Sequence, residues 1–469
     1  MDTKLLRQKI LDLAIRGKLV PQDPNDEPAS VLLERIKAEK EQLIKEGKIK
    51  RSKKTATTSD SRHYPFDLPS GWVWTTLGEI GKWQAGGTPN RTIKSYYGGE
   101  IPWLKTGDLN DGIIENIPES ITEEALQNSS AKLNPTNSIL IAMYGATIGK
   151  LGILSYPAAT NQACCACIEY SAVEKYYLFY FLLSHRHHFI YKGGGGAQPN
   201  ISKEKILNTA IPLPPIEEQR RIIKAIEKWF LIINIVEANK NEALECIKVA
   251  KNKILDLAIH GKLVPQHPAD EPAIKLLKRV NPSAEITCDN EQYGNMPPNW
   301  VTIKLGGVGK WKAGATPSRT ISEYYGGTIP WLKTGDLNDG FITKIPESIT
   351  QKALDETSVY LNPTDSVLIA MYGATIGRVG ILTFPATTNQ ACCACSGYFV
   401  NKMYLFYFLI ANRSTFLALG GGGAQPNISK EKIVNLSFPL PPLAEQKRIV
   451  AKIEELFAQL DAIENSLQA

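Results

Sequence analysis

Apolar residues recur at helical spacing in the middle of the chain and again at its end. No Gly or Pro lies between Pro215 and Gly261, and apolar positions there are mostly three or four residues apart, with an interruption at Lys240. These apolar positions are Ile222, Ile226, Trp229, Ile233, Val236, Ala243, Ile247, Ala250, Ile254 and Leu257, with Ile449, Ile453, Leu456, Leu460, Ile463 and Leu467 at the end. Pro before and Gly after the pattern predict one long helix. A sustained 3.5-residue repeat predicts a left-handed coiled coil. The alternative is the buried stripe of a helix within one globular domain, but helices this long rarely serve that purpose.

Between these helical segments the pattern changes to short apolar runs separated by Gly and Pro. "NSILIAMYG" and "DSVLIAMYG" predict buried strands. Each is followed by an aromatic helix, "YYLFYFLL" or "MYLFYFLI", and then by "PNISKEKI", where Ser202 and Ser429 are expected to cap short helices. Each such region predicts a mixed α+β domain of about 150 residues, an ordinary domain size.

The chain consists of two copies of one unit. "IPWLKTGDLNDG" begins at Ile101 and again at Ile329, and "KILDLAIRGKLVPQ" at Lys9 returns at Lys253 with a single change to His. The repeat predicts an N-terminal helical segment and linker (1–64), a first globular domain (65–211), a central long helix and linker (212–289), a second globular domain (290–438) and a C-terminal helix (439–469).

The repeat also predicts how the helices pair. Ala469 aligns with Glu242 and Met1 aligns with Glu245, so the two ends of the chain together correspond to the central helix. We therefore expect neighbouring termini and an α+β fold. Two mixed α/β domains would be separated by two long antiparallel coiled-coil helices, in a cyclic arrangement with pseudo-two-fold symmetry.

Composition adds little to this picture. The 469 residues carry a net charge of +6, which permits nucleic-acid binding without requiring it. The basic run from Lys45 to Lys54 favours a solvated linker over a phosphate-contacting arm. No apolar run is long enough for a membrane span and no apolar signal core follows Met1, so a cytoplasmic location is expected.

Six cysteines fall in two copies of "CCAC", at Cys164 and Cys392. A buried strand is favoured over a zinc site, because no second ligand cluster follows at suitable spacing. The histidines at 185, 187 and 188 occur only in the first copy, and surface positions are expected for them.

Catalytic motifs are not found. "GATIGK" at Gly145 has too few residues between its glycines for a phosphate-binding loop, and Arg378 replaces its lysine in the second copy. "NPTN" at Asn134 differs from the Asn-Pro-Pro-aromatic signature of amino-group methyltransferases. We therefore expect no enzyme activity, no catalytic residues, no metal and no cofactor in this chain.

Two similar modules on a rigid spacer suit a ligand with two-fold symmetry, as the backbone of duplex DNA has. The alternative is a coiled-coil adaptor that binds proteins and has no DNA specificity.

Several motifs resemble the specificity subunit of type I restriction-modification systems. They are "GGTPNRTIKSYYGGEIPWLKTGDL", "IAMYGATIGKLGIL", "GGGGAQPNISKEKI", "IPLPPIEEQRRI" and "FPLPPLAEQKRI", and the resemblance covers nearly the whole chain. It implies that each globular domain is a target recognition domain that reads one half of a split DNA sequence. The near-identity of the two domains departs from the usual pattern and predicts an inverted-repeat target, or one close to it.

The resemblance also implies partners. The long helices would set the spacing of the domains and bind two modification subunits, which carry the adenine methyltransferase and its S-adenosylmethionine. Restriction subunits would use ATP with Mg for translocation and cleavage, and the sequence leaves their presence open. The flanks of the helices predicted to bind these partners carry Arg220, Arg221, Glu227, Lys228, Lys447, Arg448, Glu454 and Glu455, for which a solvated surface is the alternative.

Candidate DNA contacts are polar residues of Gly-rich loops that occur in both copies. Arg91 and Arg319 suit guanine edges or phosphates, and Lys105 and Lys333 suit phosphates. The remaining candidates are Thr88, Tyr144, Thr147, Gln198, Asn200, Thr316, Tyr372, Thr375, Gln425 and Asn427. A turn-stabilising role is the alternative for each. Asp108 and Asp336 are expected to hold turns, and Trp103 and Trp331 are expected in the core.

Overall fold

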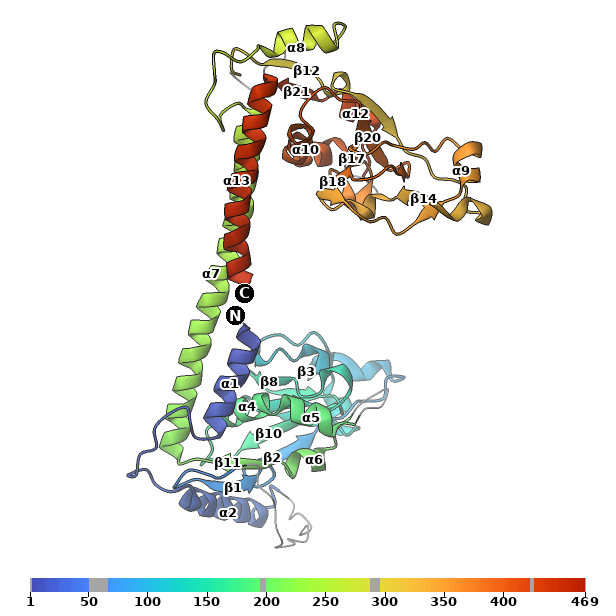
Figure 1. The fold of residues 1–469 in the computed structure, drawn as a ribbon. Helices are drawn as coiled ribbons and strands as arrows, with labels where there is room; N and C mark the ends of the chain where they lie inside the picture. Colours follow the sequence, from blue (N-terminus) through green and yellow to red (C-terminus); the bar gives the residue numbers. More distant parts are fainter. Residues whose placement is uncertain (1, 50–65, 195–199, 287–295, 422–425, 469) are drawn as a thin grey trace. The chain divides into compact units, whose positions relative to one another are not determined.

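The computed structural model describes residues 2–49, 66–194, 200–286, 296–421 and 426–468. The chain divides into two compact units, residues 2–239 and 240–469, which are described separately (Figure 1). The boundary lies within one continuous helix, α7 (Ile216–Ile259), as the Gly- and Pro-free segment predicts.

The first unit carries the elements of the first sequence copy. In chain order they are α1 (Thr3–Ile15), α2 (Ala29–Lys45), β1 (Val73–Thr76), β2 (Gly81–Ala85), η1 (Lys94–Tyr96), β3 (Tyr97–Leu104), η2 (Thr106–Asp108), β4 (Gly112–Ile114), β5 (Ser120–Ile121), α3 (Glu123–Gln127), β6 (Leu133–Asn134), β7 (Ile139–Ala142), η3 (Gly145–Thr147), β8 (Leu151–Leu154), β9 (Ala158–Thr160), β10 (Cys164–Glu169), α4 (Lys175–Ser184), α5 (Arg186–Lys192), α6 (Lys203–Leu207), β11 (Ala210–Leu213) and the first half of α7.

The second unit repeats this order. After the second half of α7 it contains α8 (Ala273–Val280), β12 (Val301–Lys304), η4 (Leu305–Gly307), β13 (Lys310–Ala313), η5 (Ser322–Tyr324), β14 (Tyr325–Leu332), η6 (Thr334–Asp336), β15 (Gly340–Ile342), β16 (Ser348–Ile349), α9 (Gln351–Glu356), β17 (Val367–Ala370), η7 (Gly373–Thr375), β18 (Val379–Leu382), β19 (Thr387–Thr388), β20 (Cys392–Ser396), α10 (Lys402–Ala411), α11 (Arg413–Leu419), α12 (Lys430–Val434), β21 (Ser437–Leu440) and α13 (Leu443–Gln468).

A five-stranded sheet forms the centre of each globular domain. Its order is β2-β10-β7-β8-β4 in the first unit and β13-β20-β17-β18-β15 in the second. The register is also the same, because Cys165 pairs with Ala85 and Ile141 just as Cys393 pairs with Ala313 and Ile369. A smaller sheet stands beside each, in the order β5-β3-β9-β6 in the first unit and β16-β14-β19 in the second. The two domains therefore share one fold, as the internal repeat predicts.

Both faces of the central sheet are buried. Alternate residues of β7 enter different cores: Ile139 and Ile141 join the cluster that includes helix α4, and Leu140 and Ala142 join the cluster beneath β3. This period of two is what a strand covered on both faces requires. The buried strands predicted from "NSILIAMYG" and "DSVLIAMYG" are confirmed.

The "CCAC" segments lie on the central strands β10 and β20, where all six thiols are buried. Burial raises the pKa of Cys165 and of Cys393 to about 12. These cysteines act as small apolar side chains of the core, as the buried-strand interpretation predicts. Among the described residues no group of three or more His, Cys, Asp or Glu side chains is arranged to hold a metal ion.

In the first unit, α1 runs antiparallel to the first half of α7 (Figure 1). Arg7 Nη2 donates to Glu237 Oε2 at 2.7 Å, whereas Gln22, just beyond α1, reaches back to Glu218 near the start of α7 at 3.0 Å. In the second unit, α13 lies antiparallel along the second half of α7, where Lys251 Nζ contacts Asp461 at 2.7 Å and Glu464 at 3.0 Å. Within each unit the predicted helix pairing is therefore present. No described helix is long and apolar enough to cross a bilayer.

The heptad pattern predicts more buried positions on α7 than the structure has. Ile222, Ile226 and Ile233 are buried, but Trp229 remains 47% exposed and Val236 38% exposed. The residues between 229 and 236 are almost all apolar, so the pattern could not show which of them face the paired helix.

One expectation about the first domain needs correction. His187 and His188 are exposed, as predicted, but His185 is partly buried and stacks on Phe181 with ring centroids 4.1 Å apart. Burial lowers the pKa of His185 to about 4. His185 lies at the junction between α4 and α5. The sequence does not show how the side chains at this junction contact the core. In the second domain Asn412 takes this position and donates to Phe408 O at 2.9 Å.

Candidate nucleic-acid interface

An exposed arginine lies on two aromatic rings in each globular domain. In the first domain the Arg91 guanidinium is 5.5 Å from the Tyr97 ring centroid and 5.4 Å from that of Trp103. In the second domain Arg319 is 4.9 Å from Tyr325 and 5.3 Å from Trp331. Both arginine side chains are 60% exposed. Cation–π contact with the rings restrains the guanidinium group, and its exposure leaves N–H groups open to solvent.

The tryptophan beneath each arginine is held by the core. Trp103 is 1% exposed and its indole N–H donates to Gly87 O at 3.0 Å. Trp331 is likewise 1% exposed and donates to Ala315 O at 3.2 Å. The prediction that both belong to the core is confirmed, and each arginine lies over the indole ring.

A carboxylate joins the arginine to the predicted phosphate-binding lysine. Lys105 Nζ is hydrogen-bonded to Glu119 Oε1, and Arg91 Nη2 lies 3.8 Å from Glu119 Oε2. This set of Arg91, Lys105 and Glu119 is called the triad of the first domain. The second-domain triad has Lys333 bonded to Glu347 and Arg319 Nη2 at 3.4 Å from the same carboxylate. The hydrogen bond from Lys333, followed by the charges of Lys333 and Arg319, holds the pKa of Glu347 below its usual value.

The turn carrying the lysine has an aspartate as its brace. Asp108 Oδ2 accepts from the backbone N–H of Lys105 at 2.8 Å, and Asp336 does the same for Lys333 at 2.8 Å. The turn-holding role predicted for these aspartates is confirmed. Glu119 and Glu347, in contrast, were not predicted as site residues. The only signal for them was the segment "IPESIT", which is identical in the two copies.

A second group of candidates surrounds the turn after the buried strand β7. Tyr144 is 41% exposed and forms a β-bridge with Asn200, and Tyr372, 42% exposed, does so with Asn427. Thr147 Oγ1 donates to Tyr144 O at 3.0 Å, and Thr375 to Tyr372 O at 2.8 Å. The threonines thus have the turn-stabilising contact that was the alternative for them. The exposed tyrosine rings and asparagine amides remain predicted DNA contacts, and Gln198 and Gln425 lie outside the described residues.

One loop connects the two groups of candidates. Thr88 Oγ1 is hydrogen-bonded to Gln162 Oε1, in the loop between β9 and β10. The next residue, Ala163, accepts a hydrogen bond from the N–H of Met143, immediately before Tyr144. Thr316 and Gln390 form the same bond in the second domain. The triad and the tyrosine turn therefore belong to one edge of each domain, here called the recognition edge.

Close backbone contact requires a glycine beside this edge. A Cβ atom on Gly86 would lie 2.2 Å from Thr160 O and 2.3 Å from Asn161 O. Gly314 meets the backbone oxygens of Thr388 and Asn389 in the same way. Only glycine allows the chain after β2 to approach the β9–β10 loop so closely.

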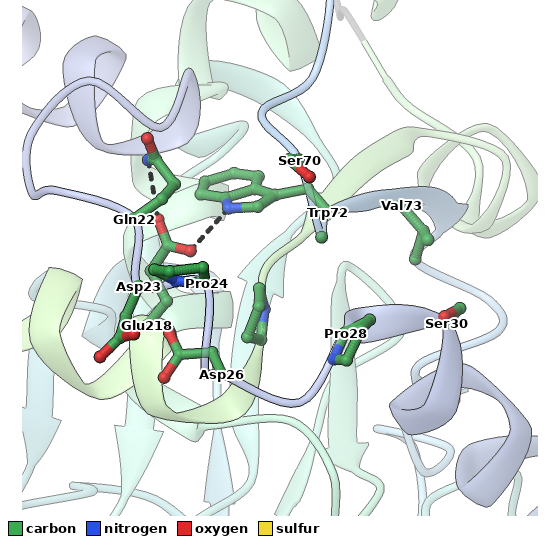
Figure 2. Close-up of a pocket in the computed structure, with 12 residues that line it drawn as sticks. Gln22, Asp23, Pro24, Asp26, Pro28, Ser30, Ser70, Trp72, Val73 and Glu218 are labelled. Carbon is green, nitrogen blue, oxygen red and sulfur yellow. Dashed lines mark hydrogen bonds between the residues drawn. The ribbon is translucent and has the colours of Figure 1, made fainter.

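The cavity shown in Figure 2 lies elsewhere, at the start of α7. It measures about 450 Å³ and is lined by Gln22, Trp72 and Glu218 among others. Glu218 Oε2 accepts from Trp72 Nε1 at 2.8 Å, and Glu218 Oε1 accepts from Gln22 Nε2 at 3.0 Å. These bonds tie the segment after α1, the entry to β1 and the start of α7 together. Because Gln22, Trp72 and Glu218 are hydrogen-bonded to one another, the residues around this cavity form a structural junction between three segments of the chain.

The second unit has the same junction, in which Glu445 Oε2 accepts from Trp300 Nε1 at 3.0 Å. Two residues predicted to bind partner subunits also take part in these junctions. Arg221 forms a two-pronged ion pair with Asp26 (3.2 and 2.5 Å), and Arg448 with Asp270 (3.3 and 2.6 Å). These arginines therefore hold the loops after the repeated helices, while Glu227, Lys228, Glu454 and Glu455 remain on exposed helix surface.

Curated relatives of the chain are specificity subunits. The type I restriction enzyme EcoEI specificity subunit of Escherichia coli is 26% identical over 99% of this chain and 91% of its own length. The EcoAI specificity subunit of the same organism is 26% identical over 97% of this chain and 88% of its own.

Two solved structures share the fold. A chain from a study of complex assembly and conformational transition of the type I restriction-modification system aligns with a TM-score of 0.63, 20% identity and coverage of 86% of this chain and 94% of that one. The crystal structure of the HsdS subunit from Thermoanaerobacter tengcongensis aligns with a TM-score of 0.52, 20% identity and coverage of 86% and 93%.

The family described as "Type I restriction modification DNA specificity domain" matches residues 69–246 and 297–469. These two ranges include both recognition edges, the whole of α13 and most of α7. The chain therefore belongs to this family and is a DNA-recognition specificity subunit of a type I restriction-modification system.

Proposed function

We propose that each globular domain reads one half of a bipartite DNA target through its recognition edge. The observation that carries this proposal is the repetition, in both domains, of an exposed arginine fixed on a tyrosine and a tryptophan. A guanidinium held in one plane can donate two parallel hydrogen bonds to O6 and N7 of guanine. The exposed Tyr144 and Asn200, with their counterparts, supply further polar groups on the same edge.

We further propose that the target is an inverted repeat or nearly one. The two domains share sheet order, strand register and the geometry of the triad, so each presents the same chemistry to DNA. Opposed modules with the same chemistry read reverse-complementary half-sites. Asn90, Gly87 and Lys94 correspond to Ser318, Ala315 and Ser322, and these small differences leave room for partial asymmetry between the half-sites. The sequence of the methylated motif tests this symmetry.

The long helices are proposed to set the spacing of the half-sites and to dock two methyltransferase subunits. Support comes from α7, whose 44 residues span about 65 Å at about 1.5 Å per residue, longer than one turn of duplex DNA at about 34 Å. The internal repeat supports an approximate two-fold relation between the halves. The partner subunits would supply S-adenosylmethionine and, where restriction subunits join, ATP with Mg. The chemistry of such a complex would then belong to the partners, and its work on DNA would place the chain in the cytoplasm.

The docking surface is proposed to include the exposed apolar side chains of α7. Trp229, Leu231, Ile232 and Ile235 are between 39% and 59% exposed, on a stretch of helix that also carries the buried Ile226 and Ile233. An apolar helix face of this kind is typical of a protein interface.

A salt series separates a DNA-recognition subunit from a protein adaptor. The full chain, with the methyltransferase that co-purifies with it, is titrated with duplex DNA at increasing salt. A recognition subunit that contacts several phosphates loses affinity linearly on a logarithmic salt scale, with a slope of about −0.9 per phosphate. Co-purification without any DNA binding, at low salt as well, would support the adaptor instead.

A further inference from the structure

A carboxylate stands inside each recognition edge, where the proposed ligand is a polyanion. Glu119 and Glu347 are half-exposed, with side chains 37% and 36% accessible. Each lies between the two cations proposed to contact DNA. An ionised carboxylate weakens the binding of a nearby phosphate, so its presence at the same place in both domains calls for a role.

The carboxylate engages its two cations unequally. It forms a direct hydrogen bond with Lys105 in the first domain and with Lys333 in the second. The arginines lie farther from it: Arg91 Nη2 is 3.8 Å away, and Arg319 Nη2 makes a longer hydrogen bond of 3.4 Å. Each arginine also lies over two aromatic rings. The lysine is therefore already paired with a carboxylate of the protein. The arginine keeps outward-facing donors.

We propose that Glu119 and Glu347 are specificity-determining residues of the recognition edges. By occupying the lysine, each carboxylate removes a phosphate contact that any DNA sequence would satisfy. Binding then depends more on base contacts from the neighbouring arginine, which only the correct half-site satisfies. This inference rests on the proposed function of the recognition edge, and it assigns Lys105 and Lys333 to the carboxylates in place of phosphates.

The test replaces the carboxylate by its neutral isostere. Glu119→Gln, Glu347→Gln and the double variant keep the side-chain shape and release the lysines. Duplex DNA of random sequence, and a duplex selected by the wild-type complex, are each titrated over a salt series. We expect tighter binding to the random duplex by severalfold and a salt slope steeper by about 0.9 per released lysine, one per substituted domain. The preference for the selected duplex should fall accordingly.

Glu100→Gln is the matched control. Glu100 is exposed on β3, the strand that also carries Trp103, and it makes no ion pair among the described residues. The control removes the same charge from the same neighbourhood without releasing Lys105, so an equal effect of Glu100→Gln would overturn the proposal in favour of net charge alone. Thermal unfolding of each variant verifies that the fold is retained.

The outcomes also separate this inference from the proposed function. If the wild-type complex shows no preference for any selected duplex, the proposed function itself fails. If the wild type selects a sequence but Glu119→Gln and Glu347→Gln leave the salt slope and the preference unchanged, only the role of the carboxylates is refuted. A steeper slope with reduced preference supports both.

Discussion

At the scale of single residues, the two domains show what one exchange does within a fixed fold. His185 and Asn412 occupy the same position at the end of α4 and α10. Both lie against the end of an aromatic helix, but only the histidine can ionise near neutral pH. At this position the first domain should therefore respond to mild acid and the second should not.

The stability of the first domain should fall between pH 6.5 and about 4. Burial lowers the pKa of His185 to about 4 from an ordinary value of 6.5, so the unfolded chain binds a proton in this range and the folded chain does not. The free energy of unfolding is highest above pH 6.5 and decreases as the pH falls. At pH 5 the decrease is about 2 kcal/mol. Hydrogen exchange of residues 175–192, compared with residues 402–419, measures this loss.

His185→Asn is the appropriate control, because it installs the residue that the second domain already uses. In this variant the extra acid sensitivity of residues 175–192 should disappear. Equal acid sensitivity of wild type and variant would contradict the assignment to His185.

Arg91 and Arg319 should each control one half of the target. Removing one guanidinium would delete the proposed two-pronged base contact, which would be worth about 1–3 kcal/mol of discrimination. Arg91→Ala is therefore expected to relax one half-site and Arg319→Ala the other, as measured by sequencing the methylated sites in cells that carry each variant. Arg35→Ala provides a control, since Arg35 is similarly exposed at 59% but lies on α2. Unchanged affinity and an unchanged motif in Arg91→Ala would remove this residue from the interface.

Residue types and the internal repeat singled out Arg91, Lys105, Trp103 and Asp108 as candidates. They did not show which side chains these residues contact. The basic residues, the tryptophan and the turn aspartate recur at fixed places in both copies, which is visible in the sequence. Glu119 comes to Lys105 through the antiparallel pairing of β3 and β5, and that strand register cannot be read from local spacing.

At the scale of elements, the start of α7 is fixed by a buried carboxylate. Glu218 is 1% exposed and accepts hydrogen bonds from Trp72 and Gln22, as Figure 2 shows. Its counterpart Glu445 has the same partners in the second unit, where burial raises its pKa. The junction joins the segment after each repeated helix to the beginning of a long helix.

Glu218→Ala should destabilise the first unit by about 1–3 kcal/mol, because it leaves the buried indole N–H of Trp72 without an acceptor. Glu218→Gln keeps an acceptor oxygen and should cost less. Urea unfolding of the full chain measures the difference, with the exposed neighbour Glu217→Gln as control. Equal stability of Glu218→Ala and wild type would show that this junction does not hold α7.

Secondary structure was more predictable than the packing of the helices. The aromatic helices, the buried "CCAC" strands and the serine caps follow from local periodicity and capping chemistry; for example, Ser202 accepts from Lys205 N at 3.2 Å. The heptad pattern, in contrast, could not show that Trp229 stays exposed. This segment is apolar on all sides of the helix. The position at which α1 packs against it decides which of its residues become buried, and that is a tertiary contact.

At the scale of the whole molecule, the central claim is that one recognition chemistry is used twice. The same sheet order, strand register, arginine platform and Arg–Lys–Glu triad occur in both units. An internal duplication preserved to this level supports the proposal of a bipartite reader whose halves have nearly the same preference. The duplication was visible in the sequence, whereas the bases that each half prefers depend on contacts made only in the DNA complex.

Single-molecule sequencing of methylated genomic DNA from cells that carry this chain and its methyltransferase tests the claim most directly. The expected motif is a half-site, an unspecified spacer and the reverse complement of that half-site, with any mismatch confined to one or two positions. A motif composed of two unrelated half-sites would contradict the account.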